Sequence, residues 1–387
     1  MSGYIHAIAY FCWRDNLIRY AGPQVIAKDL EHQHSHDKLI RTEISALIGL
    51  MVRKPIDLSL PKPEITQAFI VRTETLLREL HDAMIRPWRE GWEVSAGKRT
   101  EVDWFANAAA LREPIFYGGE SAYNFQYREF ARLKYREDDN WLDANKGFRI
   151  DEACQIGEAL GNLHSKRVIE CDRSFRKQVP HERTMLPAFQ FSAEDVAAAS
   201  QVAPEKVERF LNTFSCGPDE SNIQFTSVNE INVTNSSPII KTKGGLYILL
   251  QSFSLLEAIY ESPFYWLAQD PAYSSIASIN RGRFTESFVA DRLDIVFGNA
   301  RVLRNINIYK GKNRFAEIDA LVVYGDRAIV VQAKSKRLTI ESRKGNDYQL
   351  KDDFKRAVQG RIRPNFALRR SAHLQRLQIR DPIRSRN

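Results

Sequence analysis

The sequence of 387 residues lacks any apolar stretch long enough to cross a membrane. Its longest apolar run, at 246–260, is interrupted by several polar residues. The N-terminus has no basic region followed by an apolar one, so no signal peptide is expected. The few cysteines form no CxxC pair, which excludes a zinc knuckle and a disulfide framework; they are Cys12, Cys154, Cys171 and Cys216. These absences predict a cytoplasmic protein with reduced thiols.

Charge is distributed unevenly along the chain. The whole sequence carries a formal net charge of +8, but residues 281–387 hold 25 Lys and Arg against 11 Asp and Glu. The rest of the chain is acidic overall, with 31 basic and 37 acidic side chains. A basic C-terminal region suits a polyanionic partner such as nucleic acid, although basic charge alone is weak support.

Composition and hydrophobic periodicity divide the chain into four regions. Residues 1–185 are predicted to be a helical domain, and residues 186–275 a helix-turn-helix-like pair with a small α+β connector. Residues 276–360 are predicted to form an α/β domain, followed by a basic tail at 361–387. The expected fold is a mostly α N-terminal region followed by a C-terminal α/β domain, with a central mixed sheet flanked by helices.

Individual elements follow from the same patterns. Apolar residues at helical spacing predict helices at 40–52, 64–84, 127–135, 150–163 and 254–267. Strand-like runs predict strands at 222–233 and 239–250, the second of them bent at a Lys-Gly-Gly turn.

Three alternate histidines, His32, His34 and His36, invite a metal-binding interpretation. Alternate imidazoles on a strand could share one ion. Their neighbours are polar and nothing fixes the backbone, so a solvated loop is the favoured interpretation.

Residues 192–211 resemble the helix-turn-helix of bacterial repressors. Ser192 suits an N-cap, and Pro204 suits the start of a second helix. The second helix presents Lys206 and Arg209 together with two glutamates, and acidic groups oppose contacts with phosphate. A packed helix pair is therefore favoured, and a DNA reader that uses Lys206 and Arg209 stays as the alternative.

Near the C-terminus, two apolar β-branched runs flank a Gly-Asp pair at 325–326, which is typical of a β-hairpin. If this pair is a two-residue loop, Asp319 faces Gln332 and Glu317 faces Lys334. Opposed residues share a face and strand side chains alternate, so the four polar side chains cluster at the open end of the hairpin. The other face is apolar and consists of Ile318, Ala320, Val322, Ile329, Val331 and Ala333.

Such a polar cluster inside apolar strands has two interpretations. One is a structural ion pair at a sheet edge, and the other is a metal-dependent active site. Two features favour the active site: the preceding helix, predicted at 282–298, carries Glu286, and the surrounding region is basic.

The order of the elements extends this interpretation. A helix with Glu286 is followed by strands at 301–309, 314–324 and 327–334, with Asp319 on the second strand and Gln332-Ala333-Lys334 on the third. This arrangement, over about residues 281–359, resembles the PD-(D/E)XK nuclease superfamily. The version with Gln is most similar to Mrr-type restriction endonucleases and to the nuclease-related (NERD) group.

The resemblance implies a restriction-endonuclease-like fold and a role for each polar residue. Asp319 would be the principal metal ligand, Gln332 a second ligand, and Lys334 the residue that positions or activates water. Glu286 would complete the site from the helix. The implied cofactor is Mg²⁺ or Mn²⁺, which carboxylates hold with positions open for phosphate and water. Glu317 is either a further metal ligand or the ion-pair partner of Lys334.

Two segments follow the hairpin. A helix predicted at 347–359 offers Gln349 and Lys351 as candidates near the scissile phosphate, with a solvated face as the ordinary alternative. The tail at 361–387 contains eight Arg, no Lys and one Asp. It is either a nucleic-acid-binding arm or a truncated or frame-altered end, and poor order is expected there.

The leading functional hypothesis is a metal-dependent endonuclease that acts on DNA more than on RNA, in bacterial defence or repair. The N-terminal helical region would then recognise a target, or mediate a homodimer or a contact with a protein partner. The alternatives are an inactive nucleic-acid-binding or regulatory protein with a nuclease-like domain, and a helix-turn-helix transcription factor.

Overall fold

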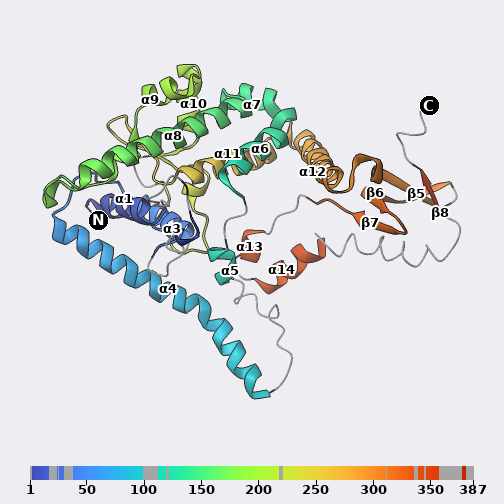
Figure 1. The fold of residues 1–387 in the computed structure, drawn as a ribbon, viewed down its shortest axis with the longest axis horizontal. Coiled ribbons are helices and arrows are strands. Elements are labelled where there is room, and N and C mark those ends of the chain that lie inside the picture. The colour runs from blue at the N-terminus through green and yellow to red at the C-terminus, as the bar shows by residue number, and fades with distance from the viewer. Residues whose placement is uncertain are drawn as a thin grey trace. The chain divides into compact units, whose positions relative to one another are not determined.

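The computed structural model describes residues 2–16, 24, 26–29, 38–98, 112–118, 122–217, 221–310, 312–334, 339–343, 346–356 and 377–380. The chain forms two compact units, one of residues 1–132 and 138–266, the other of residues 133–137 and 267–387. Figure 1 shows that helices dominate the first unit, whereas strands β5 to β8 belong to the second. The predicted helical N-terminal region and sheet-containing C-terminal region are therefore both present.

The helices up to residue 269 are α1 (Tyr4–Asp15), α3 (Arg41–Met51), α4 (Pro63–Lys98), α5 (Arg112–Tyr117), α6 (Asn124–Tyr135), α7 (Asp139–Lys146), α8 (Ile150–Phe175), α9 (Ala193–Ser200), α10 (Pro204–Thr213) and α11 (Ser252–Gln269). Each helix predicted from periodicity is present, and α4 and α8 extend beyond their predicted C-terminal ends. Among the described residues, no helix is long and apolar enough to cross a membrane.

Helix α1 occupies the core of the first unit, although no helical periodicity in the sequence predicts it. Its buried side chains lie on nearly every side of the helix, including Ile5, Ile8 and Phe11, none more than 1% exposed. A helix that is apolar all round has no amphipathic stripe to detect, and burial is what such a helix requires. The same core includes Leu186–Phe189, a 3₁₀ turn, so the predicted boundary at 185/186 runs through a shared core.

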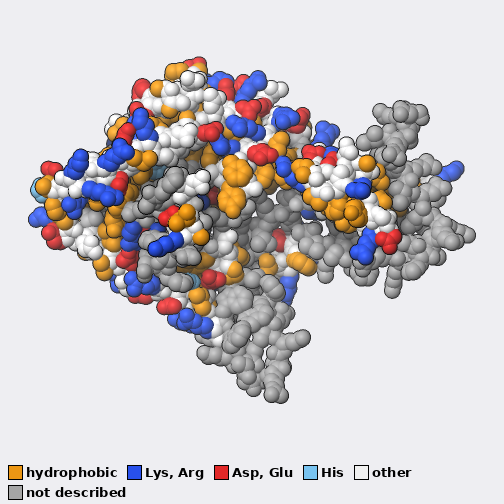
Figure 2. Space-filling view, in the orientation of Figure 1, with side chains coloured by type: hydrophobic (Ala, Val, Ile, Leu, Met, Phe, Trp, Pro, Cys, Tyr) orange, Lys and Arg blue, Asp and Glu red, His pale blue; other side chains and the backbone are white. Residues whose placement is uncertain are grey.

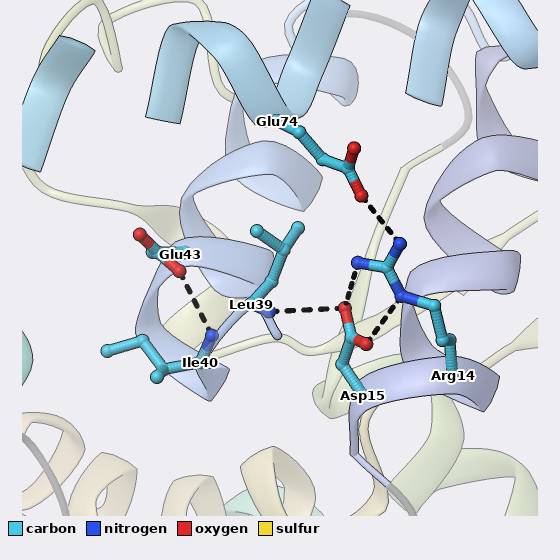
Figure 3. A network of polar contacts seen from close by, with 6 residues as sticks. All are labelled: Arg14, Asp15, Leu39, Ile40, Glu43 and Glu74. Carbon is cyan, nitrogen blue, oxygen red and sulfur yellow. Dashed lines mark hydrogen bonds and ion pairs between the residues drawn. The ribbon is translucent and has the colours of Figure 1, made fainter. Parts of the chain in front are cut away.

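A charged network anchors the C-terminal end of α1 (Figure 3). The Asp15 side chain is fully buried and accepts from Arg14 Nε at 2.6 Å and from the Leu39 backbone N–H at 3.2 Å. Arg14 also binds Glu74 of α4 at 2.5 Å. Burial lowers the pKa of Arg14, but its bonds to Asp15 and Glu74 outweigh that effect and raise it above its ordinary value. The network thus connects α1, α4 and the start of α3.

The predicted strand at 222–233 is wrong, because this segment forms turns held by asparagine side chains. Asn222 Nδ2 donates to the Gly49 carbonyl at 2.9 Å, and Asn232 Oδ1 accepts from the Thr234 backbone N–H at 3.1 Å. Side-chain amides of this kind compete with a strand ladder for the backbone. The predicted bent second strand is a hairpin of β3 (Ile239–Lys241) and β4 (Tyr247–Ile248).

The small sheet of the first unit has the order β1-β4-β3-β2, with β1 (Gln190–Phe191) and β2 (Ser215–Cys216) at its edges. β2 runs parallel to β3, so this sheet is mixed. Helices α9 and α10 pack on each other and on α8 and α7 respectively. The predicted cap is present, since Ser192 Oγ accepts from the Asp195 backbone N–H.

The second unit contains α12 (Ser274–Phe297), α13 (Ile340–Arg343) and α14 (Asp347–Phe354) with a four-stranded sheet. Its strands are β5 (Val302–Lys310), β6 (Asn313–Tyr324), β7 (Arg327–Val331) and β8 (Leu377–Arg380), in the order β7-β6-β5-β8. All three pairings are antiparallel, which corrects the predicted mixed character of this sheet. β8 lies within the predicted basic tail and pairs with β5.

Helix α12 begins eight residues earlier than predicted, since it runs through Gly282 to its C-cap at Gly298. It packs against β5 and β6. Arg304 of β5, whose sheet partner is Ala320, binds Asp291 at 2.8 Å and also binds Asp294 of α12. The rings of Phe297 and Tyr324 meet edge to face. Helix α12 therefore covers the sheet face that carries Ile318, Ala320 and Val322.

Candidate active site

The β6–β7 hairpin has the predicted register. Its ladder runs from Tyr324 opposite Arg327 to Ala320 opposite Val331. Gly325 has a φ of 63°, the left-handed conformation that a two-residue hairpin loop needs and that glycine adopts without strain. Figure 2 shows hydrophobic side chains at the surface of this part of the second unit, where Ile329 and Val330 are 44% and 40% exposed.

The ladder ends one residue before the predicted site. β7 stops at Val331, and the carboxylate of Asp319 accepts the backbone N–H of Ala333 at 2.7 Å. Gln332 Nε2 donates to the backbone carbonyl of Glu317 at 2.6 Å. Side chains thus replace the backbone ladder at the open end of the hairpin, and they bring Asp319 and Gln332 together there. Asp319 is only 6% exposed.

The ion-pair partner of Glu317 is not Lys334, the partner that the hairpin register suggested. Its carboxylate is paired with Arg314, three residues earlier on β6, and both side chains are about half exposed. Within the described residues, Glu317 is therefore not paired with Lys334. Lys334 is exposed and follows Ala333 directly. It follows the residue whose backbone N–H binds the buried Asp319.

Glu286 lies in the middle of α12, on the helix that packs against one face of the sheet. Strand alternation puts Asp319 on the face opposite Ala320, whereas α12 covers the face of Ala320. In the described part of the chain, no three His, Cys, Asp or Glu side chains form a group that could hold a metal. The structure thus binds the Gln332 side chain to the backbone of Glu317 and the Asp319 side chain to the backbone of Ala333. The contribution of Glu286 stays a prediction.

The other candidate residues are placed as follows. His32, His34 and His36 lie outside the described residues, as does most of the segment 361–387. Gln349 and Lys351 lie on α14, which packs on α13.

The basic residues of α10 contact neighbouring helices of the first unit. Lys206 Nζ binds Glu152 of α8 at 2.7 Å. The side chain of Arg209 lies where a Cβ on Gly147 would stand. These contacts agree with the favoured packed pair of helices.

Two asparagines of β5, Asn305 and Asn307, were not predicted from the sequence as candidate site residues. Asn307 stands directly opposite Glu317, and Asn305 lies between residues that pair with Ala320 and Ile318. The signal was the alternation Asn-Ile-Asn-Ile at 305–308, which places both asparagines on the face of Asp319. Recognising it required the register between β5 and β6, which the sequence alone did not supply.

Comparison with protein families gives a match in the basic C-terminal region of the chain. Comparison with curated proteins and with solved structures finds no significant match. A family model described as "NERD: Nuclease-related domain" matches residues 281–385. That match includes α12 from Arg281 onward, the strands β5 to β8 and most of the predicted basic tail. The segment 281–385 is accordingly a nuclease-related domain, part of the PD-(D/E)XK-like nuclease superfamily.

Proposed function

We propose that the C-terminal unit has a restriction-endonuclease-like core and hydrolyses phosphodiester bonds of DNA with the help of Mg²⁺ or Mn²⁺. The observation that carries this proposal is the buried carboxylate of Asp319, bonded to the backbone of Ala333 within the nuclease-related segment. Gln332 and Lys334 are the chain neighbours of Ala333, so this bond holds the carboxylate against the backbone stretch that carries both residues. A nuclease needs such a fixed oxygen ligand next to a cationic group.

The donor atoms suit a hard divalent cation. Asp319 supplies carboxylate oxygen, and Gln332 supplies an amide oxygen, both of the type that Mg²⁺ prefers. Gln332 uses Nε2 for the carbonyl of Glu317, so Oε1 is the amide atom suited to a cation. When bound, the ion would lower the pKa of a water molecule and stabilise negative charge on phosphate.

The side chains themselves perform the remaining tasks. The bond from Ala333 holds Asp319 in one orientation before substrate arrives, which avoids reorganisation during the reaction. Lys334, exposed at the same point, can stabilise the charge that develops on phosphate. The basic surround of the domain favours binding of the polyanionic substrate.

Nicking of supercoiled plasmid in the presence of Mg²⁺ or Mn²⁺ tests the proposal. Asp319→Asn and Lys334→Ala should each lower the rate by about 100-fold or more. The matched control for charge is Asp326→Asn at the hairpin turn, where the side chain is 97% exposed. Lys312→Ala, also on an exposed residue, is the control for Lys334. Cleavage that survives both site substitutions would refute the assignment, and preferential cleavage of a matched RNA would correct the substrate.

A second candidate function is binding of nucleic acid without cleavage. The observation that favours it is the ligand set: Gln332 is a neutral amide, and Glu317 is engaged with Arg314. Asp319 is then the one carboxylate of the hairpin directed at the site. Retention of labelled duplex by the wild-type protein, with no nicking in either metal, would support this function over hydrolysis.

A further inference from the structure

The candidate site extends onto a third strand of the sheet. The pairs Arg304–Ala320 and Ile306–Ile318 keep one register on both sides of Asn305, so no residue is inserted there. Strand alternation therefore holds, and the two asparagines of β5 share a face with Asp319 and Glu317. One row across the sheet contains Asn305 and Asp319, and the next contains Asn307 and Glu317.

The backbone of β5 is unusual at this point. Asn305 has a φ of 53°, in the left-handed region that few residues other than glycine adopt within a strand. A register shift follows between Ile308 and Tyr309, opposite the segment that leads into Glu317. Strained residues and strand irregularities of this kind are concentrated near functional sites, where they redirect side chains.

Asn307 supplies a second, independent observation. Its side-chain oxygen Oδ1 is buried and has no hydrogen-bond partner among the described residues. A buried acceptor left without a donor is energetically costly, and a donor brought by a ligand would remove that cost. The atom is suited to a ligand that brings a hydrogen-bond donor.

A water molecule of a hydrated cation is such a donor. Diagonal neighbours on adjacent antiparallel strands, such as Asn307 and Asp319, have Cα atoms about 7–8 Å apart. That separation is long for shared direct coordination, but a bound water can bridge it. Mg²⁺ commonly retains several of its waters when proteins bind it. Lys334 is a less suitable donor, because it follows β7 and is two strands away from β5.

We propose that Asn307 is a positioning residue, whose Oδ1 accepts a hydrogen bond from a water of the hydrated divalent cation held at Asp319 and Gln332. This inference rests on the proposed metal-dependent function. It assigns to β5 a part of the site that the hairpin residues alone do not provide. Loss of such an outer partner typically lowers metal affinity by about 10-fold or more.

Titration of the full-length protein with Mn²⁺, followed by calorimetry, tests the proposal without relying on cleavage. Asn307→Leu removes the acceptor and keeps the branched shape of the side chain, and Asn307→Asp retains an oxygen at the same place. Asn313→Leu, at the exposed start of β6, is the matched control. We expect Asn307→Leu to weaken Mn²⁺ binding by about 10-fold, while Asn307→Asp and the control bind at least as well as the wild type.

Thermal unfolding in EDTA separates positioning from a structural role. Removal of an unpaired buried acceptor should leave the melting temperature of Asn307→Leu at or above that of the wild type. Wild-type Mn²⁺ affinity in Asn307→Leu, or a clear loss of stability in EDTA, would overturn the inference and leave the proposed function standing. Absence of Mn²⁺ binding in the wild type itself would overturn the metal site and this inference together.

Discussion

Replacement of His164 should reduce the free energy of unfolding that the protein loses at acidic pH. This histidine lies on α8, with its ring centroid 4.9 Å from that of Phe189. It borders a small cavity that is also lined by Leu160 and Leu163. Its Nε2 is buried and has no hydrogen-bond partner in the part of the chain that the structure describes. Burial lowers the pKa of His164 from 6.5 to about 4, because the imidazolium form would lose its hydration there.

The sign and size of the effect follow from proton linkage. The unfolded chain takes up a proton on His164 near pH 6.5, and the folded chain does so only near pH 4. Folding stability is therefore unaffected above the higher value and falls as the pH drops between the two. The loss is about 2 kcal/mol at about pH 5, and about 3 kcal/mol once the pH is below both values.

Urea unfolding at about pH 7.5 and about pH 5 measures this loss. The wild type should lose about 2 kcal/mol more than His164→Leu between the two conditions. His6, whose pKa is also lowered by burial, leaves some acid sensitivity in both proteins. His181→Leu removes an exposed histidine and serves as the control. An equal acid-induced loss in the wild type and His164→Leu would refute the reasoning.

Three further substitutions test other contacts. Asp15→Asn leaves Arg14 without its buried partner and should lower the free energy of unfolding by about 3–5 kcal/mol, as measured by urea titration. Gly147→Ala places a Cβ 2.2 Å from Arg209 Cδ at a φ of 79°, and should lower the melting temperature through a cost of about 1–3 kcal/mol. Lys206→Ala should leave duplex affinity unchanged in fluorescence anisotropy, because this ammonium binds Glu152; weaker binding would favour the helix-turn-helix reader.

The hairpin shows which features local sequence determines. Strand side chains alternate with period two, and a glycine at the turn fixes the loop length, so the register around Gly325 could be read from residues close in sequence. The end of the ladder could not be read in that way. It depends on the carboxylate of Asp319 accepting from Ala333, a side-chain contact that no periodicity encodes.

In the first unit, two features could not be predicted from local sequence. The apolar character of α1 was visible, but a helix buried on all sides has no periodic stripe, and its neighbours come from distant parts of the chain. The segment at 222–233 has the composition of a strand, yet Asn222 and Asn232 accept the backbone N–H groups of Val233 and Thr234 at its end. In both cases tertiary contacts, which depend on the complete fold, outweighed local preference.

The docking of α12 indicates which face of the sheet carries the chemistry. The helix contacts Arg304 and Tyr324, and so covers the face on which apolar side chains stabilise the sheet by burial. The opposite face is freed from that requirement and can hold polar groups. Asp319 belongs to this second face and is nevertheless buried, which strengthens its interaction with any bound charge. If Glu286 contributes to the same site, its side chain must reach past the edge of the sheet, whereas Asn307 already lies on the correct face.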